Sequence, residues 1–174
     1  MERGRSRATG REAPTWTGSA RSTMLECGVV DLRVGAYAVI IDDEGRMLLP
    51  HWRDETLGSG WTLPGGGMDP GEHPHDTVVR EVMEETGYEI EPGELLDVGS
   101  LIIPGDRRRA EHGGTPLQAL RIIYRARITG GSLRVEQDGT TDDVAWFAPE
   151  EIDMLDRVDL VDLARRRAGL LTSA

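Results

Sequence analysis

Three glutamates, Glu81, Glu84 and Glu85, lie within two helical turns of one another, shortly after a run of glycines. At about 100° per residue, Glu84 and Glu85 fall roughly 60° and 40° to either side of Glu81, so the three acids share one face of a helix. Like charges at this spacing destabilise a helix by about 0.2–0.5 kcal/mol per pair. Carboxylates gathered in this way suit hard cations such as magnesium or manganese.

The glycine run, Gly65 to Gly67, decides between two interpretations of these acids. The first is a solvated charged face in which Arg80 neutralises one acid, because most charge clusters are of that kind. The second is a metal site, since glycines let the backbone approach whatever the carboxylates hold and aim a carbonyl at the same point. The glycines favour the metal site, although the helix alone favours the solvated face.

The helix that must position the acids has both of its ends marked in the sequence. Pro74 suits the first turn of a helix and Gly87 suits the position after its end, which predicts a helix from Pro74 to Thr86. Its apolar residues cluster opposite the acids and predict packing on a core; they are Val78, Val79, Val82 and Met83.

Strand patterns surround this helix on both sides. Residues 34–52 predict two strands around a turn at 42–45, which is the pattern of a hairpin. "SGWTLPGGG" predicts a short strand running into a loop, and further strands follow in "ELLDVGSLII", "ALRIIYRARITGG" and "VAWFA", with a long loop over 104–118. Apolar residues at helical spacing after Pro149 predict one or two closing helices. This order of elements favours a mixed β-sheet with helices packed on its faces.

The stretch from Gly66 to Tyr88 resembles the Nudix box, G-x5-E-x7-R-E-U-x-E-E-x-G-U, in which U is a bulky aliphatic residue. The positions that match are Gly66, Glu72, Arg80, Glu81, Val82, Glu84, Glu85 and Gly87. Tyr88 departs from the pattern at a packing position, which leaves the chemistry intact. So many fixed positions at fixed spacing rarely match by chance, and the flanks "WTLPGGG" and "VAWFAPEEI" are also similar to those of the family.

The resemblance implies an α/β (α+β) fold, a Nudix-like α/β/α sandwich with a mixed β-sheet. It also implies hydrolysis of a phosphoanhydride bond in a nucleoside diphosphate linked to another moiety, with ADP-ribose or a nucleoside triphosphate as candidate substrates and Mg²⁺ or Mn²⁺ as the cofactor. One alternative is a non-catalytic Nudix-like domain that binds a nucleotide as a sensor. Another is a purely structural calcium site or a solvated face.

By the same resemblance, the metal ligands are Glu81, Glu85, Glu84 and the carbonyl of Gly66. Glu81, Glu84 and Arg80 form the implied catalytic group, while an ion pair between Arg80 and Glu72 is expected to orient the helix. The general base is either a glutamate of the box or an acid in "VEQDGTTDD" before the last strand. The downstream candidates are Glu136, Asp138 and Asp142, with Asp143 beside them.

Charge and composition limit the partners of this chain. A net charge of −11 over 174 residues disfavours nucleic-acid binding, because a polyphosphate backbone is repelled by such a field. No apolar run is long enough to span a bilayer, and the N-terminus lacks the apolar core of an export signal. We therefore expect a cytoplasmic protein with a small nucleotide-type substrate and no membrane partner, and a homodimer stays open. Residues 1–23 have the composition of a disordered arm, which leaves 24–174 as a single domain.

Overall fold

The described residues form two β-sheets and three α-helices. The computed structural model describes residues 29–55, 58–108, 110–112, 114–135 and 139–171. The first sheet has the order β4-β1-β6-β5, with strands β1 (Asp31–Ile40), β4 (Gly65–Gly67), β5 (Tyr88–Ile103) and β6 (Leu117–Gly131). The second has the order β3-β2-β7, with strands β2 (Met47–Asp54), β3 (Gly58–Trp61) and β7 (Thr141–Phe147).

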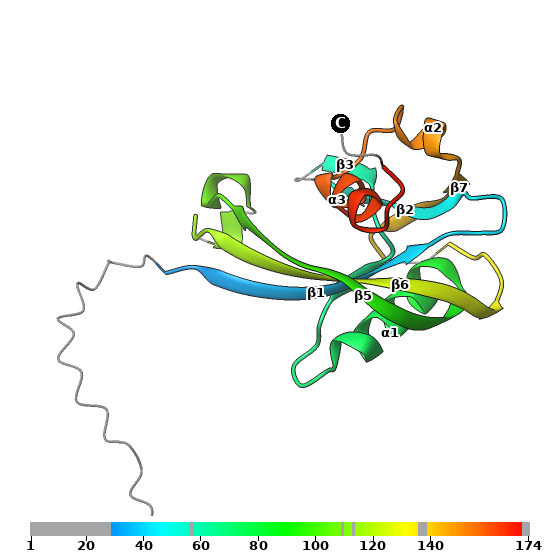
Figure 1. Ribbon diagram of the computed structural model, residues 1–174. Coiled ribbons are helices and arrows are strands. Elements are labelled where there is room, and N and C mark those ends of the chain that lie inside the picture. Colours follow the sequence, from blue (N-terminus) through cyan, green and yellow to red (C-terminus); the bar gives the residue numbers. More distant parts are fainter. Residues whose placement is uncertain (1–28, 56–57, 109, 113, 136–138, 172–174) are drawn as a thin grey trace, which may run out of the picture.

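The helices lie on opposite faces of the first sheet (Figure 1). Helix α1 (Pro74–Thr86) covers one face, while α3 (Asp159–Arg167) and the second sheet lie on the other. The short helix α2 (Pro149–Ile152) follows β7. Because β1 pairs in parallel with β6 and antiparallel with β4, the first sheet is mixed, and the predicted fold class is confirmed.

Two apolar clusters fill the space between these layers. Under α1, Val78 and Val82 pack with Ala36, Ala38 and Ile40 of β1, all of them almost fully buried. On the other face, the buried side chains include Val39, Leu49, Ile123, Leu160 and Val161. Strand β1 therefore contributes to both clusters, because successive residues of a strand point to opposite faces.

Helix α1 begins and ends where the sequence predicts. Pro74 occupies its first turn, and Gly87 ends it in the left-handed region with φ of 74° while donating its backbone N–H to the carbonyl of Met83. A Cβ on Gly87 would lie 2.5 Å from the backbone oxygen of Ser132, so both the turn and the close approach require glycine.

Two local predictions were wrong, those for the hairpin and for the glycines, whereas the predicted long loop is present. Strands β1 and β2 do not form a hairpin ladder; beyond an isolated bridge between Ile41 and Met47 they enter different sheets. The glycines 65–67 form strand β4 rather than a loop. The long loop contains two 3-10 helices, η1 (Gly105–Arg107) and η2 (Ala110–His112). For the hairpin and the glycines, pairing with distant residues overrides the local pattern.

Other expectations concern the limits of the chain. In the described part of the chain, no helix has the length and apolar character needed to cross a bilayer. The predicted disordered arm at 1–23 lies outside the described residues, and the single domain at 24–174 stays a prediction.

Candidate active site

Arg80 is the centre of the acidic cluster on α1. Its guanidinium donates to Glu72 through Nε at 2.8 Å and Nη2 at 2.9 Å, to Glu81 at 3.0 Å and to Glu84 at 3.1 Å through Nη1, and to the carbonyl of Gly67 at 3.2 Å. The predicted ion pair with Glu72 is therefore present. One arginine joins the helix, the loop before it and strand β4.

Glu72 is held in its charged form. Hydrogen bonds from Arg80, then from the backbone N–H of Asp69 and the hydroxyl of Thr77, lower the pKa of Glu72 to about 2. The same pairing, foremost with Glu72, raises the pKa of Arg80. Both groups therefore stay ionised at neutral pH, and their contact is a fixed structural brace.

Glu81 lies directly against the glycine strand. A Cβ on Gly66 would come within 2.5 Å of Glu81 Oε2, so the carboxylate occupies the space that a side chain at position 66 would fill. Burial raises the pKa of Glu81, although the hydrogen bond from Arg80 opposes this shift. Charge at Glu81 is thus only partly compensated by the protein.

Glu85 faces a different set of partners. Its Oε2 accepts from the backbone N–H of Gly65 at 2.9 Å, and its Oε1 accepts from the hydroxyl of Thr141 at 3.3 Å. Thr141 is almost fully buried at the start of β7. The three glutamates are therefore divided: Glu81 and Glu84 contact Arg80, and Glu85 connects β4 to β7.

The chemistry of these donors fits a hard divalent cation. In the part of the chain that the structure describes, no three Asp, Glu, His or Cys side chains converge on one point that would hold a metal ion. The oxygens nevertheless match, since carboxylates and a peptide carbonyl are the ligands that Mg²⁺ and Mn²⁺ prefer. The cradle at Gly66 and the partly compensated charge of Glu81 add to this fit.

Of the downstream candidates for a general base, Asp142 is described. It occupies a bulge in β7, where the register shifts between the pairs His51–Asp143 and Trp52–Thr141. Its Oδ1 lies 2.6 Å from Nδ1 of His51, and this contact lowers the pKa of Asp142. Glu136 and Asp138 lie outside the described residues. The identity of the base stays a prediction.

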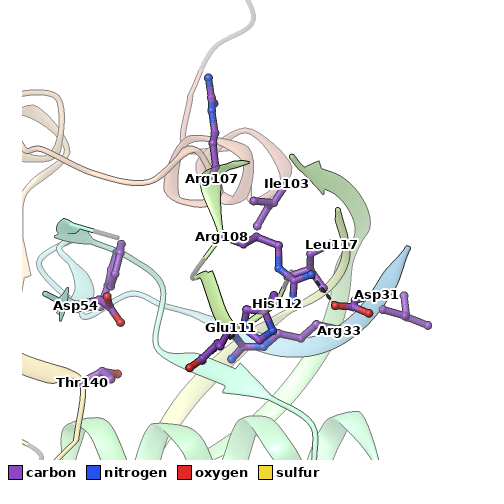
Figure 2. A pocket seen from close by; sticks show the side chains of 12 residues that line it. Asp31, Arg33, Asp54, Ile103, Arg107, Arg108, Glu111, His112, Leu117 and Thr140 are labelled. Atoms are coloured by element: carbon purple, nitrogen blue, oxygen red, sulfur yellow. Dashed lines mark hydrogen bonds and ion pairs between the residues drawn. The ribbon is translucent and has the colours of Figure 1, made fainter. Parts of the chain in front are cut away.

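A cavity of about 700 Å³ lies between β1, β2 and the loop that follows β5. Its charged lining is mixed, with Asp31, Arg33, Asp54, Arg107, Arg108, Glu111 and His112, and Trp52 adds an indole ring. Figure 2 shows the ion pair between Arg108 and Asp31, and Arg107 extending away from the other labelled side chains. Arg108 is held in place because its Nη1 donates to Asp31 at 2.6 Å and to the carbonyl of Thr115 at 2.7 Å.

Sequence reasoning missed four side chains in or beside the acidic cluster, namely Thr141, Arg33, Tyr37 and Arg121. Thr141 contacts Glu85, and the charges of Arg33, Glu85, Arg121 and Glu81 all act on the phenol of Tyr37. Arg33 and Tyr37 stand four residues apart on β1 with Gly35 between them. Their alternation along one strand is the signal that places them on one face.

Comparisons with known proteins agree with this geometry. A family model of the NUDIX domain matches residues 31–166. A MutT-like protein of Streptomyces ambofaciens is 29% identical over 68% of this chain and 66% of its own length. The human 8-oxo-dGDP phosphatase NUDT18 is 32% identical over 73% of this chain and 37% of its own length. This chain therefore spans less than two thirds of either curated relative.

The fold is also that of a solved structure. A NUDIX hydrolase from Nitrosomonas europaea superposes with a TM-score of 0.65 at 24% identity, covering 83% of this chain and 98% of its own. The family match covers strand β1, the acidic helix and most of α3. The chain belongs to the Nudix family.

Proposed function

We propose that this chain is a divalent-metal-dependent pyrophosphohydrolase. Its substrate would be a nucleoside diphosphate linked to another moiety, and the bond cleaved would be a phosphoanhydride. The observation that carries this proposal is the contact between Glu81 and Gly66, where a carboxylate fills the side-chain space of a glycine strand. Glu84 and Glu85 lie on the same face of α1 as Glu81, and Arg33, whose charge acts on Glu81, lines the 700 Å³ cavity.

In this proposal Glu81, Glu84, Glu85 and the carbonyl of Gly66 hold Mg²⁺ or Mn²⁺. When bound, the cation neutralises phosphate charge and makes a bound water more acidic. Arg80 orients Glu81 and Glu84 and fixes the helix to β4. Glu136, Asp138 and Asp142 remain the downstream candidates for the base that takes the proton from water.

The cavity supports a substrate of nucleotide size. A volume of about 700 Å³ lies within the usual range of about 300–1,000 Å³ for small-molecule sites. The indole of Trp52 offers an aromatic face for a base, and the mixed charges offer partners for hydroxyls and phosphates. ADP-ribose and nucleoside triphosphates are the candidates that we carry forward, in a cytoplasmic protein.

Glu85→Gln tests the proposal. The purified protein is mixed with Mg²⁺ or Mn²⁺ and, separately, with ADP-ribose, dinucleoside polyphosphates, nucleotide sugars, nucleoside triphosphates and 8-oxo-dGDP, and the products are quantified. We expect turnover of at least one class to fall about 100-fold or more in the variant, since losing even a partner that only orients a metal ligand costs about 10–100-fold.

Glu94→Gln is the matched control. Glu94 is exposed on β5, and its nearest cation is Arg125 at 3.8 Å. This variant should hydrolyse substrate at the wild-type rate. Metal-dependent binding of a nucleotide without turnover of any class by the wild type would overturn the proposal and favour the sensor alternative.

A further inference from the structure

A second and smaller cavity, of about 190 Å³, lies on the face of the first sheet opposite α1. Arg33, Tyr37 and Arg121 line it, together with apolar side chains of β5, β6 and α3. Gly35 separates Arg33 from Tyr37 on β1 and pairs with Arg121 on β6. Because residues two apart on a strand and paired residues on its neighbour share a face, the two arginines and the phenol point to the same side of the sheet.

Arg121 is buried without full compensation. The residue is 9% exposed, its Nη1 donates to Asp159 at 2.9 Å, and its Nε has no hydrogen-bond partner among the described residues. A buried donor without a partner costs about 1–3 kcal/mol, so native proteins rarely leave one unless a ligand or water satisfies it. The cavity that Arg121 lines has room for several waters or one phosphoryl group, since a water takes about 30 Å³.

Arg33 adds a second positive charge to the lining of this cavity. Within the described ranges, its guanidinium makes no hydrogen bond or ion pair, and it lines both the small cavity and the 700 Å³ cavity. A Cβ on Gly67 would lie 3.1 Å from its Nη2, which places the guanidinium directly against strand β4. Arg33 therefore stands where the two cavities and the glycine strand meet, and Figure 2 shows it among the side chains that line the larger cavity.

The phenol of Tyr37 connects this cluster to the acidic helix. A Cβ on Gly35 would lie 3.0 Å from Tyr37 Oη and 2.8 Å from the carbonyl oxygen of Gly66. The hydroxyl and this carbonyl therefore both border the space that a side chain at Gly35 would fill. A phenol carries its proton at neutral pH and can donate a hydrogen bond.

We propose that Arg33, Tyr37 and Arg121 form an anion subsite that binds a phosphoryl group of the substrate directly, across strand β4 from the glutamates. This inference rests on the proposed function. It names the protein groups that bind the part of the diphosphate that the cation does not contact. Two guanidinium groups and a phenol supply N–H and O–H groups, and phosphate oxygens accept hydrogen bonds from such donors. The carboxylate of Asp159 neutralises one guanidinium and leaves a net positive charge of one.

The test measures binding of a non-hydrolysable diphosphate, α,β-methylene-ADP, to the full chain by calorimetry in EDTA and again in Mg²⁺. We expect Arg33→Ala to weaken binding in EDTA about tenfold or more, the loss of about 1.4 kcal/mol that one charge-assisted contact carries. Tyr37→Phe should weaken it less, and Arg33→Lys should restore part of the affinity because charge returns without the planar fork.

Arg127→Ala is the matched control. Arg127 lies on the same strand as Arg121 but is 71% exposed and pairs with Glu91, so its variant should bind like the wild type. Circular dichroism should give each variant the wild-type spectrum. Wild-type affinity in both Arg33→Ala and Tyr37→Phe would overturn the subsite.

Two further arms separate this inference from the proposed function. Glu85→Gln should keep the EDTA affinity while losing turnover. If the wild type cleaves no substrate yet its binding depends on Arg33, the proposed function fails and the subsite stands. Binding of orthophosphate is measured last. An affinity much weaker than that for α,β-methylene-ADP supports a subsite for a phosphoryl group within a longer substrate. Equal affinity for the two ligands overturns that assignment.

Discussion

At the scale of single residues, Arg80 shows how one side chain organises the acidic cluster. Its planar guanidinium reaches Glu72, Glu81, Glu84 and the carbonyl of Gly67 at the same time. Lysine carries the same charge, but its compact ammonium cannot span four acceptors in one plane. The geometry of the guanidinium, rather than its charge alone, fixes the two glutamates.

Arg80→Lys is therefore expected to lower both stability and activity. Losing one charge-assisted hydrogen bond costs about 1.5 kcal/mol, which lowers Tm by about 3–6 °C for a chain of this size. Turnover should fall at least about tenfold, because Glu81 and Glu84 lose their common partner. Calorimetry measures Tm, and the substrate assay measures turnover. Arg134→Lys, at an exposed position, should change neither quantity. An unchanged Tm in Arg80→Lys would contradict the role given to the planar guanidinium of Arg80.

The sequence predicts side-chain contacts of this kind only between residues that are close to one another in the chain. Glu72 and Arg80 stand eight residues apart across the start of one helix, so their pairing follows from the pattern. Arg33 and Arg121 are 88 residues apart (121 − 33) and meet because β1 pairs in parallel with β6. No local pattern encodes that register, which is set by the packing of the whole sheet.

At the scale of elements, strand β4 decides how close the helix comes to the sheet. Pro74 and Gly87 allow the bounds of α1 to be predicted, because each acts through local backbone geometry. The strand character of the three glycines cannot be predicted in the same way, since glycine disfavours strands and β4 exists through pairing with β1. Because β4 consists of glycines, Glu81 can approach it from one face and Arg33 from the other.

Gly66→Ala should separate activity from stability. The added Cβ would lie 2.5 Å from the carboxylate of Glu81, the flexible end of a side chain that can move aside, so the fold should survive. We expect Tm to fall by less than about 4 °C while hydrolysis falls about tenfold or more as Glu81 is displaced.

Gly93→Ala provides the comparison for this variant. A Cβ at Gly93 meets only the carbonyl of Arg125 at an ordinary 3.6 Å, so both Tm and turnover should stay at wild-type values. Full activity in Gly66→Ala would show that the position of Glu81 against β4 does not matter for catalysis.

At the scale of the whole molecule, an ion pair between a buried arginine and an exposed aspartate joins α3 to α2. Arg165 of α3 is 2% exposed and donates to Asp153, which follows α2, at 2.6 Å. It also donates to the carbonyl of Pro149 at 3.1 Å. The periodicity predicts closing helices but not where they lie. The contacts of Arg165 hold α2 and α3 together beside the second sheet.

This pair gives the fold a dependence on acid. The hydrogen bond from Arg165 lowers the pKa of Asp153 below its ordinary value of 3.8. A lowered folded-state pKa adds stability that is complete above the unfolded value and is lost as pH falls below it toward the folded value. We expect the difference in urea midpoint between the wild type and Asp153→Asn to be largest at pH 6–7 and to shrink below about pH 4.

Glu150→Gln serves as the control for this titration. Glu150 is exposed in α2, the short helix that Asp153 follows, and no ion pair to it is found among the described residues, so its variant should follow the wild type at every pH. A wild-type advantage over Asp153→Asn that stays constant down to pH 3 would show that the charge of Asp153 does not stabilise the fold.

The parallel pairing of β1 with β6 also bears on how the protein is made. Asp31 pairs with Leu117, so the ribosome completes the first central strand long before its partner exists. Closing so large a loop is slow compared with forming local contacts. Helix α1 and its acids can form early, whereas the cluster of Arg33, Tyr37 and Arg121 waits for residues beyond 117 to leave the exit tunnel. A nascent chain arrested before that point contains the carboxylates, Arg33 and Tyr37 but lacks Arg121, which makes co-translational folding the step at which the proposed anion subsite is first completed.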